Sequence, residues 1–393
     1  MDVVERYVEL GLRLGRHVDG IVDAYFGPPK IAQRVEGEEL RPAAALSADA
    51  EALREDVAAS DLEPQRRAWL DDQLVGLSTY AAVIGGERID YADEVERCFG
   101  VRPEHVPEAR FEEAHARLDA VLPVGGTLAE RYEAWREATR VPPPALLDVF
   151  AQVSAVLQDA TRRRYGLPDG EEFESELAPD APWLAYNYYL GGLRSRVAIN
   201  PDRVIPVMEL VDLAAHEAYP GHHTEHAWKE RALVRTGVTE EALLMIPTPQ
   251  SLVSEGIAEN AWDAVVDDET APRLARALEG AGVSFDLETA TAVRLARRAL
   301  RFVSANVALL IHVDGATAEE AQAYSAQWSA TNLKTAAASA RFITDPLWRS
   351  YVATYSYGGD LVRRHVAGDD DRFRGLLTRH TRVADLAPLV SAS

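Results

Sequence analysis

Most of the chain carries the spacing of apolar residues that is typical of α-helices. In the opening segment Val4, Val8, Val18 and Val22 fall near one helical face, and the pattern stops at residues 27–29, Gly-Pro-Pro. Proline suits the first position of a helix, so a helix is expected from Pro64 to the glycine pair at 85–86. With Ser47 as a possible cap, the same signals predict further helices at about 47–57, 90–98, 107–121, 128–139, 144–164, 251–267, 270–279, 286–311, 317–341 and 346–365.

The pattern changes between residues 166 and 204. Glycine and proline interrupt the helical spacing, and aromatic and β-branched residues then surround Gly191-Gly192, which predicts short strands near 183–200, arranged as a hairpin. Helical spacing returns after Pro206. We therefore expect a mostly α-helical protein with a small β-hairpin or sheet, in which residues 1–165 form a helical lobe and 166–393 hold the chemistry, joined as one integrated domain.

Composition and charge limit the classes of function. The 393 residues are 47% apolar and 26% charged, as expected of a globular protein, and the net charge of −22 would repel the phosphate backbone of a nucleic acid. Cys98 is the only cysteine, so a disulfide within the chain and a cysteine-based zinc site are both excluded. No apolar run approaches the roughly 20 residues of a membrane span, and the first residues lack the features of a signal peptide. We expect a cytoplasmic protein that binds neither membranes nor nucleic acid.

Four histidines lie close together in the sequence, at positions 216, 222, 223 and 226. Neutral imidazole is a good zinc ligand, and in many zinc proteases a glutamate that follows the first histidine acts as general base. His216-Glu217 begins that pattern, but the position of the usual second histidine is Pro220. On an unbroken helix His222 would lie roughly 9 Å farther along the axis, too far to share an ion with His216. The pair Pro220-Gly221 can interrupt the helix, so we expect a break there.

Two alternatives concern the second ligand. His222 is preferred over His223, because removing Tyr219-Pro220 from the segment restores the usual spacing. A competing frame, residues 222–226, matches the inverted His-x-x-Glu-His pattern, but it leaves the adjacent His216-Glu217 pair unexplained.

The third ligand should come from a distant segment. Glu255 is the preferred candidate, and Glu259, one helical turn later, could replace it or orient a histidine from behind. Three protein ligands, His216, His222 and Glu255, would leave one position of a zinc ion open for water, and Glu217 would accept that water's proton.

At these residues the chain resembles a bacterial family catalogued as domain of unknown function 885. The family is grouped with zinc metallopeptidases of the His-Glu-x-x-His type, near thimet oligopeptidase and carboxypeptidase Taq. The resemblance rests on His216–His223, which is similar to the family's His-Glu-Ala-x-Pro-Gly-His-His signature. Weaker similarities follow in order at Cys98–Glu104, Ser195-Arg196 with Asn200, Ser254–Gly256, His312–Ala321 and Tyr355–Gly358. The chain is shorter than typical members and lacks an acidic residue before His312.

The resemblance implies roles for residues outside the histidine cluster. A tyrosine from a late helix would stabilise the oxyanion, with Tyr355 preferred over Tyr357, and His223 is counted among the catalytic candidates. Residues 197–200 would form the strand beside the cleft and pair with an extended peptide. The candidates for substrate binding are Arg196, Asn200, Tyr357 and Arg349, with either arginine able to hold a substrate carboxylate.

The sequence therefore predicts a zinc metallopeptidase that cleaves peptide bonds of short substrates. One alternative is a zinc hydrolase of a non-peptide amide or ester, and another is a helical scaffold or binding protein with a structural metal. The two enzyme hypotheses predict an open metal position and loss of turnover in Glu217→Gln. The scaffold hypothesis predicts four protein ligands and no effect of that substitution.

Overall fold

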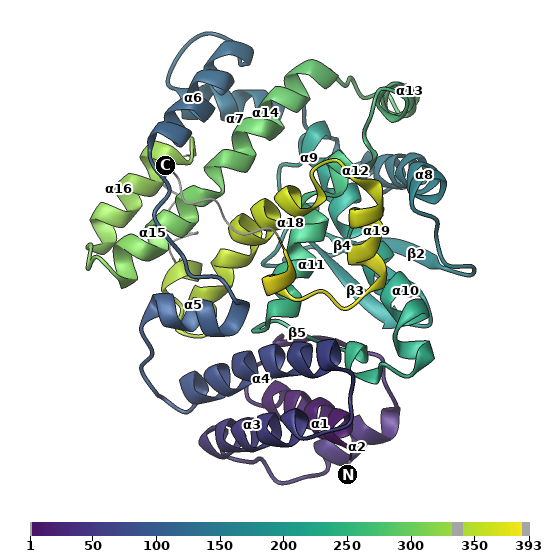
Figure 1. Ribbon diagram of the computed structural model, residues 1–393. Coiled ribbons are helices and arrows are strands. Elements are labelled where there is room, and N and C mark those ends of the chain that lie inside the picture. The colour runs from purple at the N-terminus through teal and green to yellow at the C-terminus, as the bar shows by residue number, and fades with distance from the viewer. Residues whose placement is uncertain (1, 332–340, 387–393) are drawn as a thin grey trace.

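Four N-terminal helices form a layer at one end of the molecule, drawn in purple and dark blue at the bottom of Figure 1. The computed structural model describes residues 2–331 and 341–386. The helices of this layer are α1 (Val3–Gly15), α2 (Pro29–Glu36), α3 (Ala43–Ala58) and α4 (Pro64–Ile84). Tyr7 of α1 is buried against Trp69 of α4, with ring centroids 6.3 Å apart. As predicted, α4 begins at Pro64.

Two predictions for this layer were wrong. The opening helix ends at Gly15, and the following residues form a strand, β1 (Val22–Tyr25). Helix α3 begins at Ala43 rather than at Ser47, whose hydroxyl instead donates a hydrogen bond to the carbonyl oxygen of Ser78, 3.1 Å away. In both places a contact with a segment distant in sequence overrides the local signal.

Strand β1 joins the N-terminal layer to the rest of the molecule. It pairs antiparallel with β5 (Leu243–Met245), more than 200 residues later in the chain. A carbon added at Gly11 of α1 would meet the side chain of Leu243 at 2.5 Å, so α1 lies directly against this two-stranded sheet. The N-terminal residues are therefore fixed against the segment that follows the histidine cluster.

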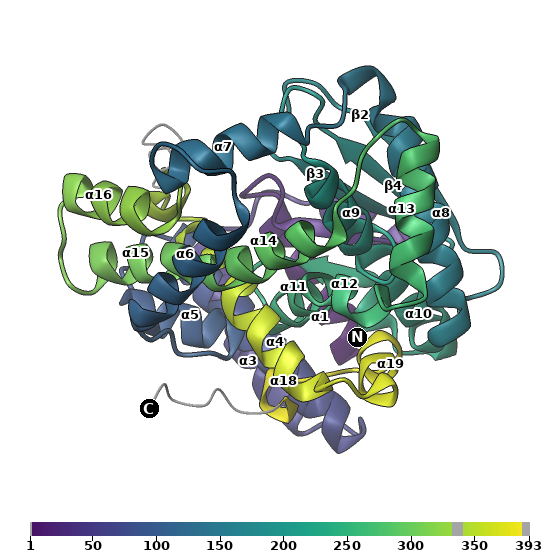
Figure 2. The same cartoon turned by 90° about the horizontal axis from the view of Figure 1, so that it is seen from above.

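The second sheet contains the predicted hairpin. Strands β3 (Ala185–Gly191) and β4 (Arg194–Ile199) pair antiparallel, which confirms it, and β2 (Glu172–Leu177) adds a parallel strand that the sequence did not predict. The order is β2-β4-β3, so β4 is hydrogen-bonded along both edges. The expectation that residues 197–200 pair with an extended substrate was therefore wrong, because no edge of β4 is open. Strand β3 is the outer strand that lies against the helices of the histidine cluster (Figure 2).

The remaining helices surround these sheets, and the described part of the chain is mostly α-helical with small sheets, as predicted. None of its helices is long and apolar enough to span a membrane. Between the N-terminal layer and β2 lie α5 (Tyr91–Phe99), α6 (Ala109–Val121), α7 (Leu128–Ala138) and α8 (Leu146–Arg164). After β4 come α9 (Val207–Glu217), α10 (His222–Ala232), α11 (Pro249–Glu259), α12 (Ala261–Val265), α13 (Thr270–Gly280), α14 (Leu287–Leu300), α15 (Phe302–His312), α16 (Ala318–Trp328), α18 (Gly359–Val366) and α19 (Asp370–Thr378).

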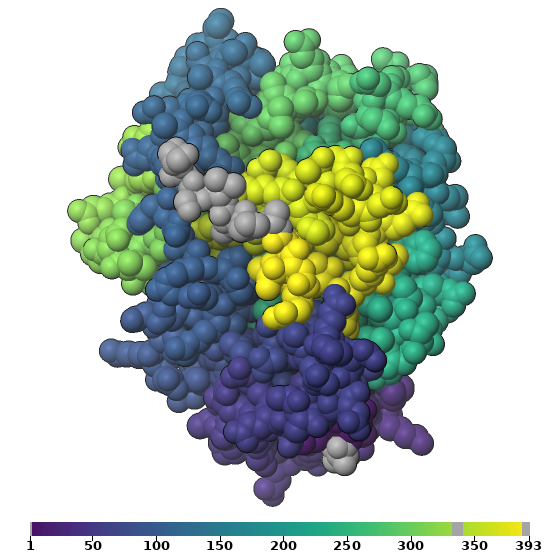
Figure 3. Space-filling model, viewed as in Figure 1, coloured from purple at the N-terminus to yellow at the C-terminus, as the bar shows by residue number. Residues whose placement is uncertain are grey.

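The C-terminal predictions were correct in outline and wrong in detail. The helix expected over 286–311 is divided at Arg301 into α14 and α15. Thr317 and Glu320 form a capping box. The helix expected over 317–341 ends at Trp328, and residues 332–340 lie outside the described part of the chain. In the space-filling view, the yellow segment with α18 and α19 occupies the middle of one face, next to the N-terminal layer (Figure 3).

Helix α11 lies at the centre of the fold, and two glycines let the backbone of a later turn approach it closely. A carbon added at Gly256 would lie 2.5 Å from the carbonyl oxygen of Gly358 and 2.6 Å from the side chain of Val362. Gly358 ends a π-helical turn, Thr354–Gly358, that leads into α18. Because neither residue has a side chain, this turn packs directly on α11, beside Glu255.

Candidate metal centre

The helix that carries the histidines is interrupted where the sequence predicted. Helix α9 ends at Glu217 and α10 begins at His222, with a cis peptide bond between Tyr219 and Pro220. The backbone folds so tightly here that a carbon added at Gly221 would lie 2.6 Å from the carbonyl oxygen of Ala215. The turn brings the His222 ring to within 4.8 Å of the His216 ring, centroid to centroid.

The three predicted metal ligands converge. Nε2 of His216 lies 3.6 Å from one carboxylate oxygen of Glu255, and Nε2 of His222 lies 3.9 Å from the other. One potential ligand atom from each of the three residues lies within 4.8 Å of the others. Zinc–ligand distances of about 2.0–2.2 Å place neighbouring ligands of a tetrahedral ion roughly 3.4 Å apart. The arrangement therefore needs only a small contraction to hold a metal ion.

The hydrogen bonding of Glu255 is incomplete in a way that a bound cation would complete. Its Oε1 accepts a hydrogen bond of 2.8 Å from the Tyr351 hydroxyl, whereas its buried Oε2 has no hydrogen-bond partner in the described part of the chain. A buried carboxylate oxygen without a partner is costly, and a cation held with His216 and His222 would satisfy it.

A chain of hydrogen bonds fixes the orientation of His222. Nδ1 of His222 lies 3.2 Å from the hydroxyl of Ser254, which donates to Oε2 of Glu225 at 2.6 Å. Oε1 of Glu225 accepts a hydrogen bond of 2.7 Å from Lys229. Since Ser254 uses its proton on Glu225, it accepts from His222, and this contact leaves Nε2 of His222 free to bind a metal.

The inverted frame is less well suited to a metal. His222, Glu225 and His226 also place potential ligand atoms within 4.8 Å of one another. However, both oxygens of Glu225 are already hydrogen-bonded, to Ser254 and Lys229. Glu225 thus acts as a partner of the residues that orient His222.

Glu259 lies behind His216 rather than among the ligands. Its Oε1 is 3.9 Å from Nδ1 of His216, on the opposite side of the ring from Glu255, and its carboxylate pairs with Arg301. Burial lowers the pKa of His216 well below its usual value, with the charge of His222 acting in the same direction, so the ring is neutral as a metal ligand requires.

Glu217 has the environment of a general base. It is buried, and burial raises the pKa of its carboxyl group to about 7, a shift that His222 opposes and that Glu255 and Asp23 increase. The side-chain amide of Asn187 on β3 donates a hydrogen bond of 2.6 Å to the Glu217 carbonyl oxygen, which fixes the end of α9 against the sheet. A carboxyl group with a pKa near neutrality suits proton transfer.

Two tyrosines close together in the sequence, Tyr351 just before the π-helical turn and Tyr355 within it, lie beside the candidate metal ligands. Tyr351 is hydrogen-bonded to Glu255, and its ring centroid is 5.5 Å from that of Tyr355. Tyr355 is 37% exposed, so a substrate can reach it. Partial burial and the charge of Glu255 raise the pKa of Tyr355, so its hydroxyl keeps its proton and can donate a hydrogen bond. The sequence analysis missed Tyr351, although its spacing of four residues from Tyr355 was a usable signal.

Asp23 is a second residue that the sequence analysis missed. It lies on β1, in the part of the chain that was expected to carry no chemistry, and Tyr186 of β3 donates a hydrogen bond to it. Its charge affects the pKa values of Glu217, His222 and Glu255. The pairing of β1 with β5 brings Asp23 close to these residues, and no local sequence motif predicts that position.

His223 does not face the metal ligands. Its side chain is fully buried, with Nδ1 2.8 Å from the hydroxyl of Ser195 and Nε2 2.9 Å from a carboxylate oxygen of Glu171. The same oxygen accepts a hydrogen bond from Tyr219. Both ring nitrogens of His223 are therefore used by the protein, and the residue anchors the interrupted helix to the sheet.

Two of the four predicted substrate-binding residues are fully engaged elsewhere. Nε of Arg349 donates a hydrogen bond of 2.9 Å to buried Glu94 on α5. Side-chain Nδ2 of Asn200 donates to the carbonyl oxygens of residues 181 and 183, and its Oδ1 accepts from the backbone of Asp202. These contacts hold Arg349 and Asn200 in structural positions.

The other two candidates differ from each other. The hydroxyl of Tyr357 exchanges hydrogen bonds with the backbone of Glu104, and only 4% of the residue is exposed. Arg196 is more accessible, with 39% of its side chain exposed and its guanidinium 5.0 Å above the Tyr188 ring. The structure thus leaves Arg196 reachable and packs Tyr357 into the core.

Comparisons with known proteins show a similarity of fold but no family. No family model matches the chain. No curated protein matches it either. Among solved structures, the chain is similar to "the putative lipoprotein from Colwellia psychrerythraea", with a TM-score of 0.54 and 16% sequence identity over 91% of this chain and 68% of that one. At this identity the similarity concerns the fold alone.

Proposed function

We propose that the protein is a zinc-dependent hydrolase that cleaves peptide or related amide bonds. The observation that carries the proposal is the convergence of His216, His222 and Glu255 beside Glu217. One carboxylate oxygen of Glu255 is buried there and has no hydrogen-bond partner among the described residues. Two imidazoles and one carboxylate are a common ligand set of catalytic zinc, which keeps a position open. A structural zinc site would use four protein ligands.

The residues of the chain have separate roles in this proposal. Zinc bound by His216, His222 and Glu255 would supply a Lewis acid and lower the pKa of water at its open position. Glu217 accepts the proton of the attacking water and passes it to the leaving nitrogen. Tyr355 donates a hydrogen bond to the carbonyl oxygen as negative charge develops on it. The Tyr351 hydroxyl holds Glu255 in place.

The same site supports an amide as the bond that is cleaved. A buried carboxyl group, Glu217, and a partly exposed phenol, Tyr355, near the proposed metal ligands suit the addition of water to a carbonyl group. The outer strand β3 contacts both α9 and α10 and borders the site, so an extended peptide could lie beside it. A non-peptide amide remains the second candidate, because the chemistry at the carbonyl group is the same.

The proposal is tested by metal analysis and peptide digestion of two variants. Glu217→Gln removes the general base, and Glu87→Gln, on an exposed turn, makes the same chemical change away from the site. We expect about one zinc ion per chain in the wild type and both variants. We expect cleavage of a peptide library by the wild type and Glu87→Gln, with a loss of at least about 100-fold in Glu217→Gln. Absence of stoichiometric metal, or full activity of Glu217→Gln, would contradict the proposal.

A further inference from the structure

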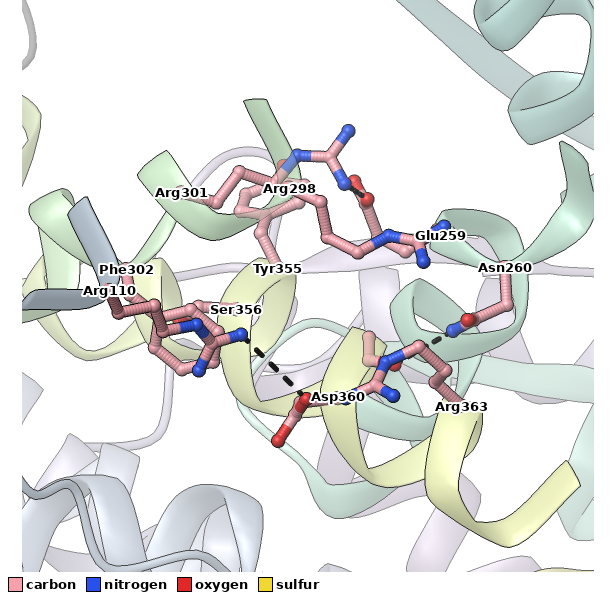
Figure 4. Close-up of a pocket in the computed structure, with 11 residues that line it drawn as sticks. Arg110, Glu259, Asn260, Arg298, Arg301, Phe302, Tyr355, Ser356, Asp360 and Arg363 are labelled. Carbon is pink, nitrogen blue, oxygen red and sulfur yellow. Dashed lines mark hydrogen bonds and ion pairs between the residues drawn. The ribbon is translucent and has the colours of Figure 1, made fainter. Parts of the chain in front are cut away.

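A hollow lined by arginines lies next to the metal centre. Figure 4 shows Arg110, Arg298, Arg301 and Arg363 around it, against only two carboxylates, Glu259 and Asp360. The chain as a whole has a net charge of −22, so a local surplus of positive charge is unusual in this protein. Two further carboxylates pair with arginines of the hollow: Asp212 with Arg301, and Asp263 with Arg298. Both also pair with Arg294, so they do not cancel the surplus of positive charge.

The hollow and the metal centre share a wall. Glu259 lines the hollow, and its Oε1 lies 3.9 Å from Nδ1 of the metal ligand His216. Tyr355, the proposed hydrogen-bond donor to the substrate carbonyl, also lines the hollow and is partly exposed. A molecule whose carbonyl group reached Tyr355 would therefore extend toward the arginines.

Among the arginines that line the hollow, Arg110 has the weakest interactions with carboxylates of the protein. It lies 4.3 Å above the ring of Phe302, and the nearest carboxylate, Asp360, is 4.0 Å away. That carboxylate already pairs with Arg363 through one oxygen and with Arg364 through the other, at 2.7 Å. Within the described residues, the Arg110 side chain makes no hydrogen bond, although it carries five donors.

The hollow itself encloses only about 10 Å³, but it adjoins a larger groove between α6, α14 and α18, which lie close together in Figure 2. This groove encloses about 320 Å³ and shares Arg110, Arg298 and Arg363 with the hollow. It adds one further arginine, Arg117, and one carboxylate, Glu113. That volume is in the range of small-molecule sites. The arginines therefore line an accessible path that leads away from Tyr355.

We propose that the arginines shared by the hollow and the groove bind a carboxylate of the substrate and so make anionic peptides or amides the preferred substrate class. The inference rests on the proposed function, which supplies the bond that is cleaved. A guanidinium can bind a carboxylate through two parallel hydrogen bonds, and Arg110 has its donors available for this. The carboxylate can belong to the C-terminus of the substrate or to an acidic side chain.

Binding of three probes of nearly equal size separates these two sources. N-acetylglutamine carries only a C-terminal carboxylate, the α-amide of N-acetylglutamate carries only a side-chain carboxylate, and the α-amide of N-acetylglutamine carries neither. Dissociation constants are measured by calorimetry on the full chain in a chelator, so that a carboxylate cannot bind through a metal. We expect at least one charged probe to bind about tenfold more tightly than the neutral probe, and the tighter one identifies the source.

Two substitutions test whether Arg110 is responsible. Arg110→Met keeps the apolar stem over Phe302 and removes the charge, and Arg102→Met makes the same charge change at an exposed ion pair outside the hollow. We expect the preference for the charged probe to disappear in Arg110→Met and to persist in Arg102→Met. Circular dichroism shows whether Arg110→Met folds. Equal binding of charged and neutral probes by the wild type would overturn the inference whether or not that variant folds. An unchanged preference in folded Arg110→Met would overturn it too.

Hydrolysis gives a second readout that distinguishes this inference from the proposed function. Two comparisons of kcat/KM are made: a peptide ending in a carboxylate against its carboxamide, and a peptide containing Glu against the same peptide with Gln. We expect kcat/KM to be higher for the acid in one of these two comparisons. In that comparison the ratio of acid to neutral substrate should fall about tenfold in Arg110→Met, through KM. Hydrolysis without any preference would leave the proposed function standing and refute the carboxylate site. Probe binding without hydrolysis would support the site and refute the proposed function.

Discussion

Gly221 offers the most direct test of how the interrupted helix builds the metal centre. In Gly221→Ala the new methyl carbon would lie 2.6 Å from the carbonyl oxygen of Ala215 and closer still to that of His216, whereas ordinary contact begins at about 3.4 Å. The obstacle is backbone, so the turn itself must move by roughly 0.8 Å to reach that limit against Ala215. Metal–ligand bond lengths vary by only about 0.2 Å, so a turn that is held in a shifted position keeps His222, the next residue, from sharing an ion with His216.

We expect Gly221→Ala to bind zinc at least about 100-fold more weakly than the wild type, a loss of roughly 2.7 kcal/mol. Competition with a chromophoric chelator measures the affinity, and circular dichroism shows whether the helices persist. The matched control is Gly375→Ala in α19, where an added carbon meets nothing within 4 Å. That change should leave zinc affinity unaltered and stabilise the helix by up to about 1 kcal/mol. Zinc affinity of folded Gly221→Ala within threefold of the wild type would refute the reasoning.

Three further predictions concern residues around the site. Ser254→Ala removes the hydroxyl that orients His222, and chelator competition should show zinc affinity about tenfold lower, with Ser251→Ala one turn earlier as control. Tyr351→Phe removes the hydrogen bond to Glu255 and should weaken zinc binding by about the same factor in the same assay; an unchanged affinity would mean that Tyr351 does not position the ligand. Arg349→Met leaves a buried carboxylate unpaired and should lower the free energy of unfolding by about 3 kcal/mol in urea titrations, whereas a substrate-binding arginine on the surface would show little loss.

The residues that converge at the candidate metal centre could be predicted from the sequence because most of the information is local. His216, Glu217 and His222 lie in one short segment, and the proline and glycine between the histidines indicated where the helix must break. The preference for His222 over His223 followed from spacing alone. The structure adds the reason: His223 faces Ser195 and Glu171, whose positions depend on the parallel pairing of β2 with β4.

Residues that reach the site through distant pairings could not be predicted in this way. Asp23 arrives because β1 pairs with β5, and the sequence of β1 was misread as the end of a helix. Arg349 looked available for a substrate, but its partner Glu94 lies more than 250 positions earlier in the chain. Helical periodicity reports which face of an element is apolar, and it carries no information on which distant charge that element will meet.

The contact between Gly256 and Gly358 has a mechanical consequence. Because two backbones touch there without intervening side chains, the tyrosine-bearing turn cannot slide along α11, and the ligand carboxylate and the phenols keep a constant separation. Room for bulkier molecules must therefore come from parts of the site that are lined by long side chains, such as the groove that contains Arg110.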